Sequence, residues 1–181
     1  MAAYDKHYVK KEYFGKPYAE LIAFFEQYSK RGTLVDLGAG QGRDAAPLAK
    51  MGYDVTAVDV SQVGLKLIKA SSPYIKTVQA DVYTFDVSEF DIILMDSMLH
   101  FYSRDKAKES KLVSDILDKM KTGAVLVNFL MKSAKSEKVL MNIIECALYE
   151  FDILEKSIVR FDFSPTEIAL STHPVKAALL I

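Results

Sequence analysis

The chain has 181 residues, 50% of them hydrophobic and 26% charged, which is the size and composition of one globular domain. Its 23 basic and 24 acidic residues leave a net charge of −1, so no whole-molecule field attracts nucleic acid or anionic lipid. The N-terminus has no apolar signal segment, and no apolar run reaches the ~20 residues that cross a bilayer. We therefore expect a cytoplasmic protein without a membrane or nucleic-acid partner.

The N-terminal segment, residues 4–18, interleaves aromatic residues with lysines. This pattern suits a lid that excludes water from a reaction, or a partly buried segment with solvated lysines. An RNA-stacking surface also fits the pattern, but the neutral overall charge disfavours it. Residues 17–28 have an amphipathic helical pattern. We expect one domain, residues 1–181, in which residues 1–32 form a lid and helix and residues 33–181 form the core.

From residue 33 onward, apolar runs alternate with helical patterns. The runs are rich in Val, Ile and Leu and show little polar alternation, which is typical of parallel strands covered on both faces. The expected strands are Thr33–Leu37, Asp54–Asp59, Thr77–Ala80, Asp91–Asp96 and Ala124–Leu130. The expected helices are Asp44–Met51, a helix capped by Ser61 that ends at Lys69, and Asp105–Met120 capped by Ser103. The alternation predicts a doubly wound α/β sheet with helices on both faces.

The end of the chain has a different pattern. A helix over Ser136–Tyr149 is followed by two strand patterns, Asp152–Phe163 and Val175–Ile181, with no long helix between them. Two such strands pair best in the antiparallel direction, because a parallel return needs a long crossover. We expect a seven-stranded sheet of five parallel strands and a C-terminal hairpin. The single cysteine, Cys146, lies in an apolar helical pattern and is expected to be buried.

A glycine-rich turn follows the first strand in the stretch LVDLGAGQGRDA, residues 34–45. Gly38, Gly40 and Gly42 let the backbone approach a ligand closely, and the next helix points its N-terminus at that ligand. A dinucleotide fingerprint requires a third glycine at position 43, where this chain has Arg43. The turn therefore favours a nucleoside cofactor other than NAD.

Asp36 lies two residues before the first glycine of this turn. A carboxylate there would repel a pyrophosphate, but it attracts a ligand that carries an ammonium and a sulfonium group. Asp36 thus favours S-adenosylmethionine as the cofactor. The same carboxylate could instead brace the turn by accepting backbone N–H groups.

Acidic residues also end the second and third expected strands. Asp59 can accept both ribose hydroxyls of an adenosine, and helix capping is its alternative role. Asp81 can accept the adenine amino group while the Val82 N–H meets a ring nitrogen, or it can simply begin a turn. Ligands of open parallel sheets bind at the carboxyl ends of the strands, where all three acids are expected.

The stretches LVDLGAGQGRDA, VTAVDVS, QADVYTF and FDIILMDSMLHF, in this order and spacing, resemble the first four motifs of the class I S-adenosylmethionine-dependent methyltransferases. GQGRDA and the leader EYFGKPYAELIAFF are most similar to the small single-domain group that includes tellurite-resistance and small-molecule methyltransferases. The resemblance covers nearly the whole chain and implies a Rossmann-like fold.

The resemblance also implies the site residues. Asp36 and the glycine turn would surround the methionine part of the cofactor, Asp59 would bind the ribose, and Asp81 with Val82 would hold the adenine. Asp96 would lie near the sulfonium and the acceptor. The expected cofactor-binding set is Asp36, Gly38, Ala39, Gly40, Gln41, Gly42, Arg43, Asp59, Val60, Asp81, Val82 and Asp96. Ala39 departs from the family, since many members have cysteine there.

The acceptor is expected beside DSMLHFYSR, residues 96–104. His100 and Asp96 are the candidate catalytic residues, with His100 as a proton acceptor. A histidine that only holds backbone at a strand-to-helix corner is the alternative. No metal is expected, because no carboxylate cluster suggests one. We expect transfer of a methyl group to a small molecule, yielding S-adenosylhomocysteine. A non-catalytic cofactor-binding module and an RNA methyltransferase are the competing hypotheses.

Overall fold

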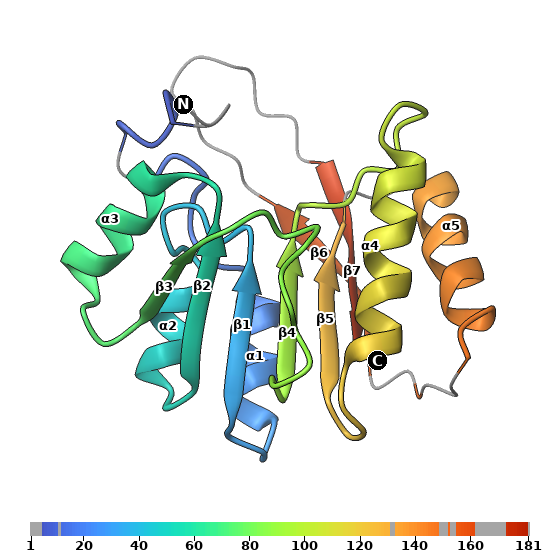
Figure 1. Cartoon of the computed structure of the whole chain (residues 1–181), viewed down its shortest axis with the longest axis horizontal. Coiled ribbons are helices and arrows are strands. Elements are labelled where there is room, and N and C mark those ends of the chain that lie inside the picture. Colours follow the sequence, from blue (N-terminus) through green and yellow to red (C-terminus); the bar gives the residue numbers. More distant parts are fainter. Residues whose placement is uncertain are drawn as a thin grey trace.

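The computed structural model of the chain describes residues 5–10, 12–130, 133–148, 152, 155–161 and 173–180. Helices and strands alternate along it, as Figure 1 shows. The helices are α1 (Ala19–Gln27), α2 (Ala45–Lys50), α3 (Gln62–Ser71), α4 (Lys106–Lys119) and α5 (Ala134–Glu145). The strands are β1 (Thr33–Leu37), β2 (Asp54–Asp59), β3 (Lys76–Gln79), β4 (Ile92–Asp96), β5 (Val125–Phe129), β6 (Glu155–Phe161) and β7 (His173–Leu180).

Five strands form the parallel sheet that the sequence predicts, in the order β3-β2-β1-β4-β5. The expected α/β doubly wound fold is therefore confirmed. The backbone of β7 lies antiparallel to β5, and β6 lies antiparallel to β7. The seven-stranded sheet with a terminal hairpin stays a prediction, because residues 162–172, which would join β6 to β7, lie outside the described residues.

The register of the central strands determines what meets at their carboxyl ends. Leu37 of β1 pairs with Val58 of β2 and with Met95 of β4. The residues that follow these three, which are Gly38, Asp59 and Asp96, therefore end neighbouring strands at one level of the sheet. This edge is uppermost in Figure 1.

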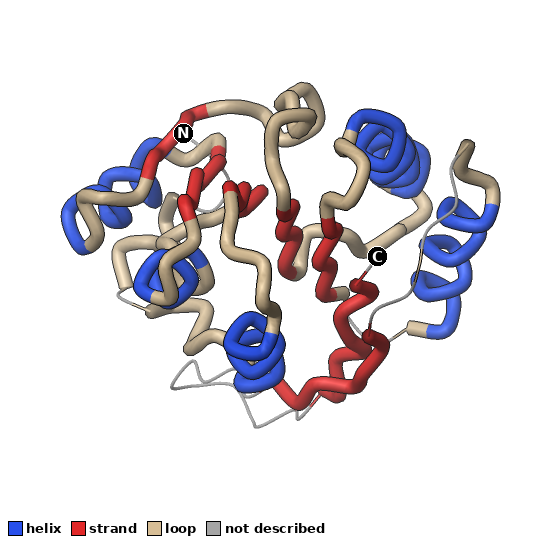
Figure 2. The backbone as a smooth tube through the Cα atoms, turned by 90° about the horizontal axis from the view of Figure 1, so that it is seen from below, coloured by secondary structure: helices blue, strands red, loops and turns tan. Residues whose placement is uncertain are grey.

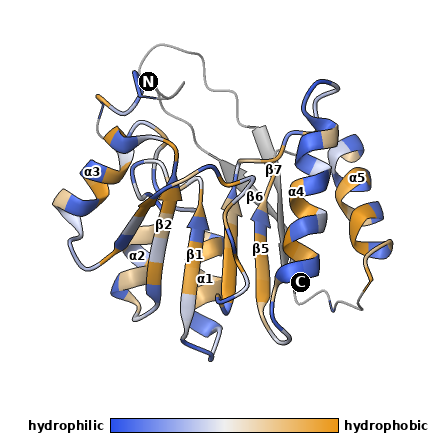
Figure 3. Ribbon diagram, in the orientation of Figure 1, coloured by the Kyte–Doolittle hydropathy of each residue, from blue (hydrophilic) through white to orange (hydrophobic). Residues whose placement is uncertain are grey.

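Helices cover both faces of the sheet, as Figure 2 shows along its edge. Apolar side chains of α1, α2 and α3 pack on one face, among them Phe25, Leu48 and Ile68. Those of α4 and α5 pack on the other, among them Val113 and Leu140. Figure 3 shows hydrophobic residues running along the central strands between these layers. Burial of this apolar surface stabilises the fold and makes the sheet edge a rigid platform.

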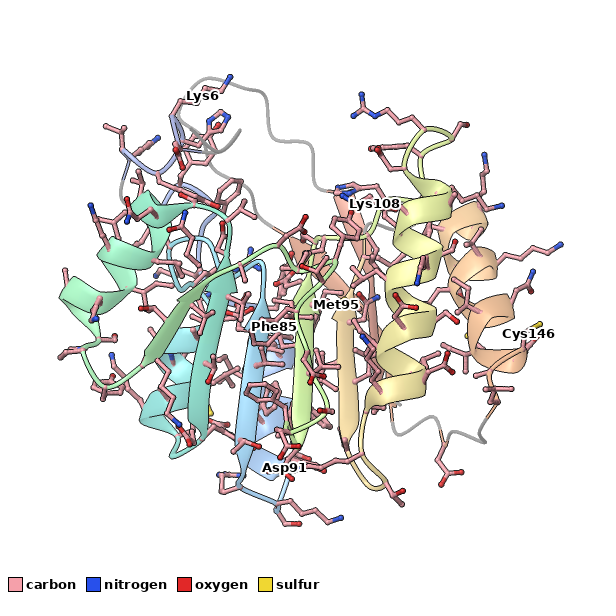
Figure 4. All side chains as sticks on the ribbon, in the orientation of Figure 1. Lys6, Phe85, Asp91, Met95, Lys108 and Cys146 are labelled. Atoms are coloured by element: carbon pink, nitrogen blue, oxygen red, sulfur yellow. The ribbon has the colours of Figure 1, made fainter. Side chains whose placement is uncertain are left out.

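Two expectations about local structure are wrong. Helix α4 begins at Lys106, and Asp105 rather than Ser103 takes the N-cap position. The N–H groups of Asp105 and Lys106 both donate to the carbonyl of Tyr102, so the chain completes a tight turn before the helix begins. Cys146 is exposed and points outward in Figure 4, because it lies at the C-cap of α5, just past the last helical residue.

No helix among the described residues combines the length and hydrophobicity that crossing a membrane requires.

The packing of α1 generates a stability prediction. The Phe25 side chain is fully buried against the sheet, whereas its neighbour Phe24 is partly buried. Phe25→Ala should lower the free energy of unfolding by about 3–5 kcal/mol, because it leaves a cavity in a close-packed core. Phe24→Ala is the matched control and should cost less than half as much. Urea denaturation of both variants measures the difference, and equal losses would contradict the placement of α1 in the core.

Candidate active site

A cleft with a volume of about 1240 Å³ opens at the carboxyl ends of β1, β2 and β4. The glycine turn after β1, the N-terminal segment and the β4–α4 connection form its walls. All predicted site residues line it, namely Asp36, Gly38, Ala39, Gly40, Gln41, Gly42, Arg43, Asp59, Val60, Asp81, Val82, Asp96 and His100. The volume exceeds the roughly 300–1,000 Å³ of common ligand pockets, so it has room for a nucleoside cofactor and an acceptor.

The glycine turn is attached to β2 through its backbone. The N–H groups of Gly38 and Ala39 both donate to the carbonyl of Val58, at 2.8 and 3.0 Å. Gly38, Gly40 and Gly42 have φ angles of 77°, 52° and 80°, which side-chain-bearing residues rarely adopt. The turn thus follows a path close to the sheet edge, where its backbone faces the cleft.

Asp59 joins the glycine turn to the start of α3. Its Oδ2 accepts the N–H of Gly40 at 2.9 Å, and its Oδ1 accepts the N–H of Ser61 at 2.7 Å. Ser61 in turn caps α3 by accepting the N–H of Gly64 at 3.1 Å, as the sequence predicted. Each carboxylate oxygen can accept more than one hydrogen bond, so Asp59 can brace the turn and still bind hydroxyls.

The close approach of α3 to the turn was not foreseen from the sequence. A Cβ atom at Gly64 would lie 2.2 Å from the carbonyl oxygen of Gly40, which excludes every side chain at position 64. Gly64 itself was the only sequence feature that indicated this contact, and it was a weak one, since a single glycine in the first turn of a helix has several possible causes.

Three aspartates and one arginine form a buried charge cluster beneath the turn. Arg43 donates to both carboxylate oxygens of Asp44 at 2.9 to 3.2 Å and forms an ion pair with Asp96. It also donates to the Phe14 carbonyl, and it lies 5.1 Å from the ring centre of Tyr18. Asp36 is 3% exposed, and among the described residues its Oδ2 has no hydrogen-bond partner.

Burial and repulsion between carboxylates shift the titration of Asp36 and Asp96. Burial and then the charges of Asp44 and Asp96 raise the pKa of Asp36 well above its usual range. Burial and the charge of Asp44 likewise raise the pKa of Asp96 to about 8, against the opposing effects of Arg43 and Ser97. One guanidinium thus faces three buried carboxyl groups. It pairs with Asp44 and Asp96, and its positive charge also acts on Asp36. The cluster would be stabilised by a further positive charge in the cleft.

The structure places the predicted adenine-binding residues at one end of the cleft. Asp81 is exposed, and its Oδ1 accepts the N–H of Tyr83 at 3.0 Å, as in the turn that the sequence offered as an alternative. Val82 is buried, whereas Val60 is half-exposed. The outer oxygen of Asp81 and the side chain of Val60 therefore remain accessible to a ligand.

The β4–α4 connection follows β4, on the other side of β1 from β2 and β3, and forms another wall of the cleft. Ser97 Oγ donates to Asp96 Oδ1 at 2.8 Å, and the His100 ring stacks on Tyr102 with their centres 5.3 Å apart. Lys108, labelled near the upper sheet edge in Figure 4, lies 3.5 Å from the ring centre of Tyr83. Met98 from this connection lines the cleft, whereas Met95 of β4 is fully buried in the core.

The N-terminal segment is held against the glycine turn by Gln41. The Gln41 Nε2 donates to the carbonyls of Tyr8 and Lys10, both at 3.0 Å, and its Oε1 accepts the N–H of Tyr13 at 3.2 Å. Ser61 Oγ also donates to the Asp5 carboxylate. The Gln41 side chain, expected to contact the cofactor, thus binds the backbone of the N-terminal segment, which lines the cleft.

The comparisons with known proteins agree with this geometry. A family model described as "Methyltransferase domain" matches residues 34–123, which run from β1 to the start of β5. A curated relative, the cypemycin N-terminal methyltransferase of a Streptomyces species, is 30% identical over 113 residues. The match covers 59% of this chain and 46% of that protein, so the chain spans less than half of the relative's length.

Two solved structures show the likeness in fold. The N-methyltransferase NodS from Bradyrhizobium japonicum, solved with S-adenosylhomocysteine, has a TM-score of 0.70 and 14% identity, over 97% of this chain and 95% of that one. A candidate RNA methyltransferase from Pyrococcus horikoshii has a TM-score of 0.72 and 16% identity over the same shares. At these identities the likeness shows the fold alone. Residues 34–123 thus match a methyltransferase domain, and the motifs and the fold support a class I S-adenosylmethionine-dependent methyltransferase, a family whose cofactor is S-adenosylmethionine.

Proposed function

We propose that the chain transfers a methyl group from S-adenosylmethionine to a small-molecule acceptor and releases S-adenosylhomocysteine. The buried cluster of Asp36, Asp44 and Asp96 carries this proposal. It has one internal cation, and Asp36 has an oxygen that no described residue satisfies. A ligand with an ammonium and a sulfonium group supplies the missing donor and the missing positive charge.

Starting from Asp36, we assign the parts of the cofactor to residues along the cleft. Asp36 would accept the ammonium group, and the backbone of the glycine turn would lie along the methionine chain. Asp59 would bind the ribose hydroxyls with the free lone pairs of its carboxylate. Val60 would contact the adenine ring, and Asp81 with Val82 would hold the edge of that ring. This order follows the lining of the cleft from β1 to β3.

When bound, the cofactor supplies a methyl group that is already activated for transfer. The protein then has to align the acceptor in line with the donor and exclude water. We assign Asp96 to the sulfonium side of the cleft and His100 to the acceptor side, where its ring can take a proton from a hydroxyl or amine acceptor. Both side chains line the same cleft, and they come from the end of β4 and from the connection that follows it.

The N-terminal segment supports a small acceptor. Tyr8 and Phe14 from this segment line the cleft together with the glycine turn, and Tyr8 is buried. We propose that residues 1–181 form a single methyltransferase domain, in which residues 1–32 form a lid and helix and residues 33–181 form the core, completed by the terminal hairpin. A lid across the cleft limits the size of the acceptor and keeps water away from the methyl group.

Two rival functions give different results in one experiment. Calorimetric titration with S-adenosylmethionine, S-adenosylhomocysteine and NAD should show binding of the first two only. Radiolabelled methyl transfer is then assayed with a primary amine, a thiol, a phenol, a carboxylate and total RNA. Labelled small-molecule product supports the proposal. Binding without transfer to any acceptor favours a non-catalytic module, and labelled RNA with salt-sensitive binding favours an RNA methyltransferase.

The ribose assignment is tested with two aspartates of one strand. Asp59→Ala should raise the Kd for S-adenosylhomocysteine at least about 100-fold, because it removes charged hydrogen bonds to the ribose. Asp54 lies at the opposite end of β2 and is paired with Lys76 on the surface. Asp54→Ala should leave the Kd within about twofold. Calorimetry of both variants is the measurement, and equal affinities would remove Asp59 from the site.

Asp36 should show a conflict between stability and binding. Its pKa is raised in the folded state, so the folded protein binds an extra proton above about pH 4 and loses stability as the pH rises. Asp36→Asn replaces this buried carboxyl group with an amide that does not ionise. The variant should therefore gain stability over the wild type as the pH rises, by about 1–3 kcal/mol at pH 7.5.

The same variant should bind S-adenosylmethionine roughly 10- to 100-fold more weakly, because it loses a charged hydrogen bond. Thermal melts at pH 5 and 7.5, together with calorimetry, measure both effects. A variant that is less stable at both pH values and binds normally would refute the role of Asp36.

The lid assignment predicts the behaviour of Gln41. Gln41→Ala removes three hydrogen bonds to the N-terminal segment. Hydrogen exchange of amides in residues 5–10 and 12–16 should become roughly 10-fold faster or more, since local opening becomes easier. Association and dissociation of S-adenosylhomocysteine should both accelerate. Gln27→Ala, at the exposed end of α1, should change neither quantity, and unchanged exchange in Gln41→Ala would contradict the lid.

A further inference from the structure

The β4–α4 connection has an unfavourable backbone path that the cofactor site does not explain. Ser97 and Phe101 have φ angles of 56° and 53°, although neither is glycine. Such conformations persist only when surrounding contacts impose them, and they concentrate at functional sites. The residue just before Phe101 is His100, which lines the cleft. Something in the surrounding structure therefore holds this part of the chain in place.

Glu109 of α4 supplies the first of these contacts. Its side chain is buried, with 4% of the residue exposed, and it does not line the cleft. Its Oε2 accepts the N–H of His100 at 3.1 Å and the N–H of Phe101 at 2.5 Å. A buried carboxylate is costly unless its hydrogen bonds repay the lost hydration, and here both bonds go to the connection.

Ser136 of α5 supplies the second contact, from another helix. Its Oγ donates to the carbonyl oxygen of His100 at 3.0 Å. Ser136 is itself held by the cap of α5, because Ser133 Oγ accepts its N–H at 3.3 Å. Both backbone polar groups of His100 are thus bonded to side chains of α4 and α5, which pack together on one face of the sheet.

We propose that Glu109 and Ser136 are positioning residues that hold the backbone of His100 so that its imidazole faces the acceptor. This inference rests on the proposed function, in which His100 is the proton acceptor. Both side chains act through the peptide groups of His100 and contact neither cofactor nor acceptor. A purely structural role for Glu109, that of an acid in the first turn of α4, would stabilise the helix without orienting the histidine.

The test uses nuclear magnetic resonance of the whole chain with and without S-adenosylhomocysteine. Glu109→Ala should make the amides of His100 and Phe101 exchange at least roughly 10-fold faster and should shift or broaden the imidazole signals of His100. The imidazole signals of His7 serve as an internal reference and should not move. Glu109→Gln retains an oxygen that can accept both N–H groups, so it should restore most of the protection.

Two further variants separate positioning from stability. Ser136→Ala should perturb the same His100 signals in a protein that remains folded, even where Glu109→Ala does not fold. Asp115→Ala removes a carboxylate from the same helix, where it pairs with Lys111, and should leave His100 unchanged. Unchanged His100 signals in folded Glu109→Ala or in Ser136→Ala would overturn the proposal.

The design also distinguishes this inference from the proposed function. Failure of the wild type to bind S-adenosylhomocysteine would refute the proposed function, whereas the exchange of the His100 amide is still measured in the free protein. In a wild type that binds, Glu109→Ala and Glu109→Gln should keep the Kd for S-adenosylhomocysteine within about twofold. A larger loss of affinity in both variants would show that Glu109 supports the cofactor side, and it would overturn the assignment to the acceptor.

Discussion

The repulsion among buried carboxyl groups around Arg43 is the constraint on which the active site depends. Asp36, Asp44 and Asp96 come from β1, the start of α2 and the end of β4, so the sheet and its packing force them together. Burial, together with the negative charge that Arg43 leaves uncompensated, raises the pKa values of Asp36 and Asp96. Active sites commonly retain such costly arrangements, because a ligand of opposite charge relieves them.

Asp59 holds the glycine turn of the same site in one conformation. Glycine turns have high conformational entropy, and this one is held by a side-chain carboxylate and by the Val58 carbonyl. The same carboxylate is bonded to the start of α3 through Ser61. A group that orders the turn before binding and also offers oxygens to a ribose would reduce the ordering that cofactor binding must impose.

The convergence of acidic residues at one edge of the sheet could be predicted from the sequence, because these residues end neighbouring strands. Apolar runs locate the strands, parallel register aligns their ends, and the acids at those ends then converge, as Asp36, Asp59 and Asp96 do. The side-chain partners could not be predicted in this way. Gln41 binds the N-terminal segment and Glu109 binds the β4–α4 connection, across 28 to 33 and 8 to 9 residues, and no periodic pattern encodes such contacts.

This difference explains how one fold can serve many acceptors. The cofactor half depends on hydrogen bonds between neighbouring strands, so a substitution there alters the sheet that supports every other element. The proposed acceptor half comprises the N-terminal segment and the β4–α4 connection, which side chains such as Gln41, Glu109 and Ser136 attach to the framework. Exchanging these few contacts would reshape the acceptor wall while the strand ends stay in place. The choice of acceptor should therefore depend on these two segments more than on the sheet.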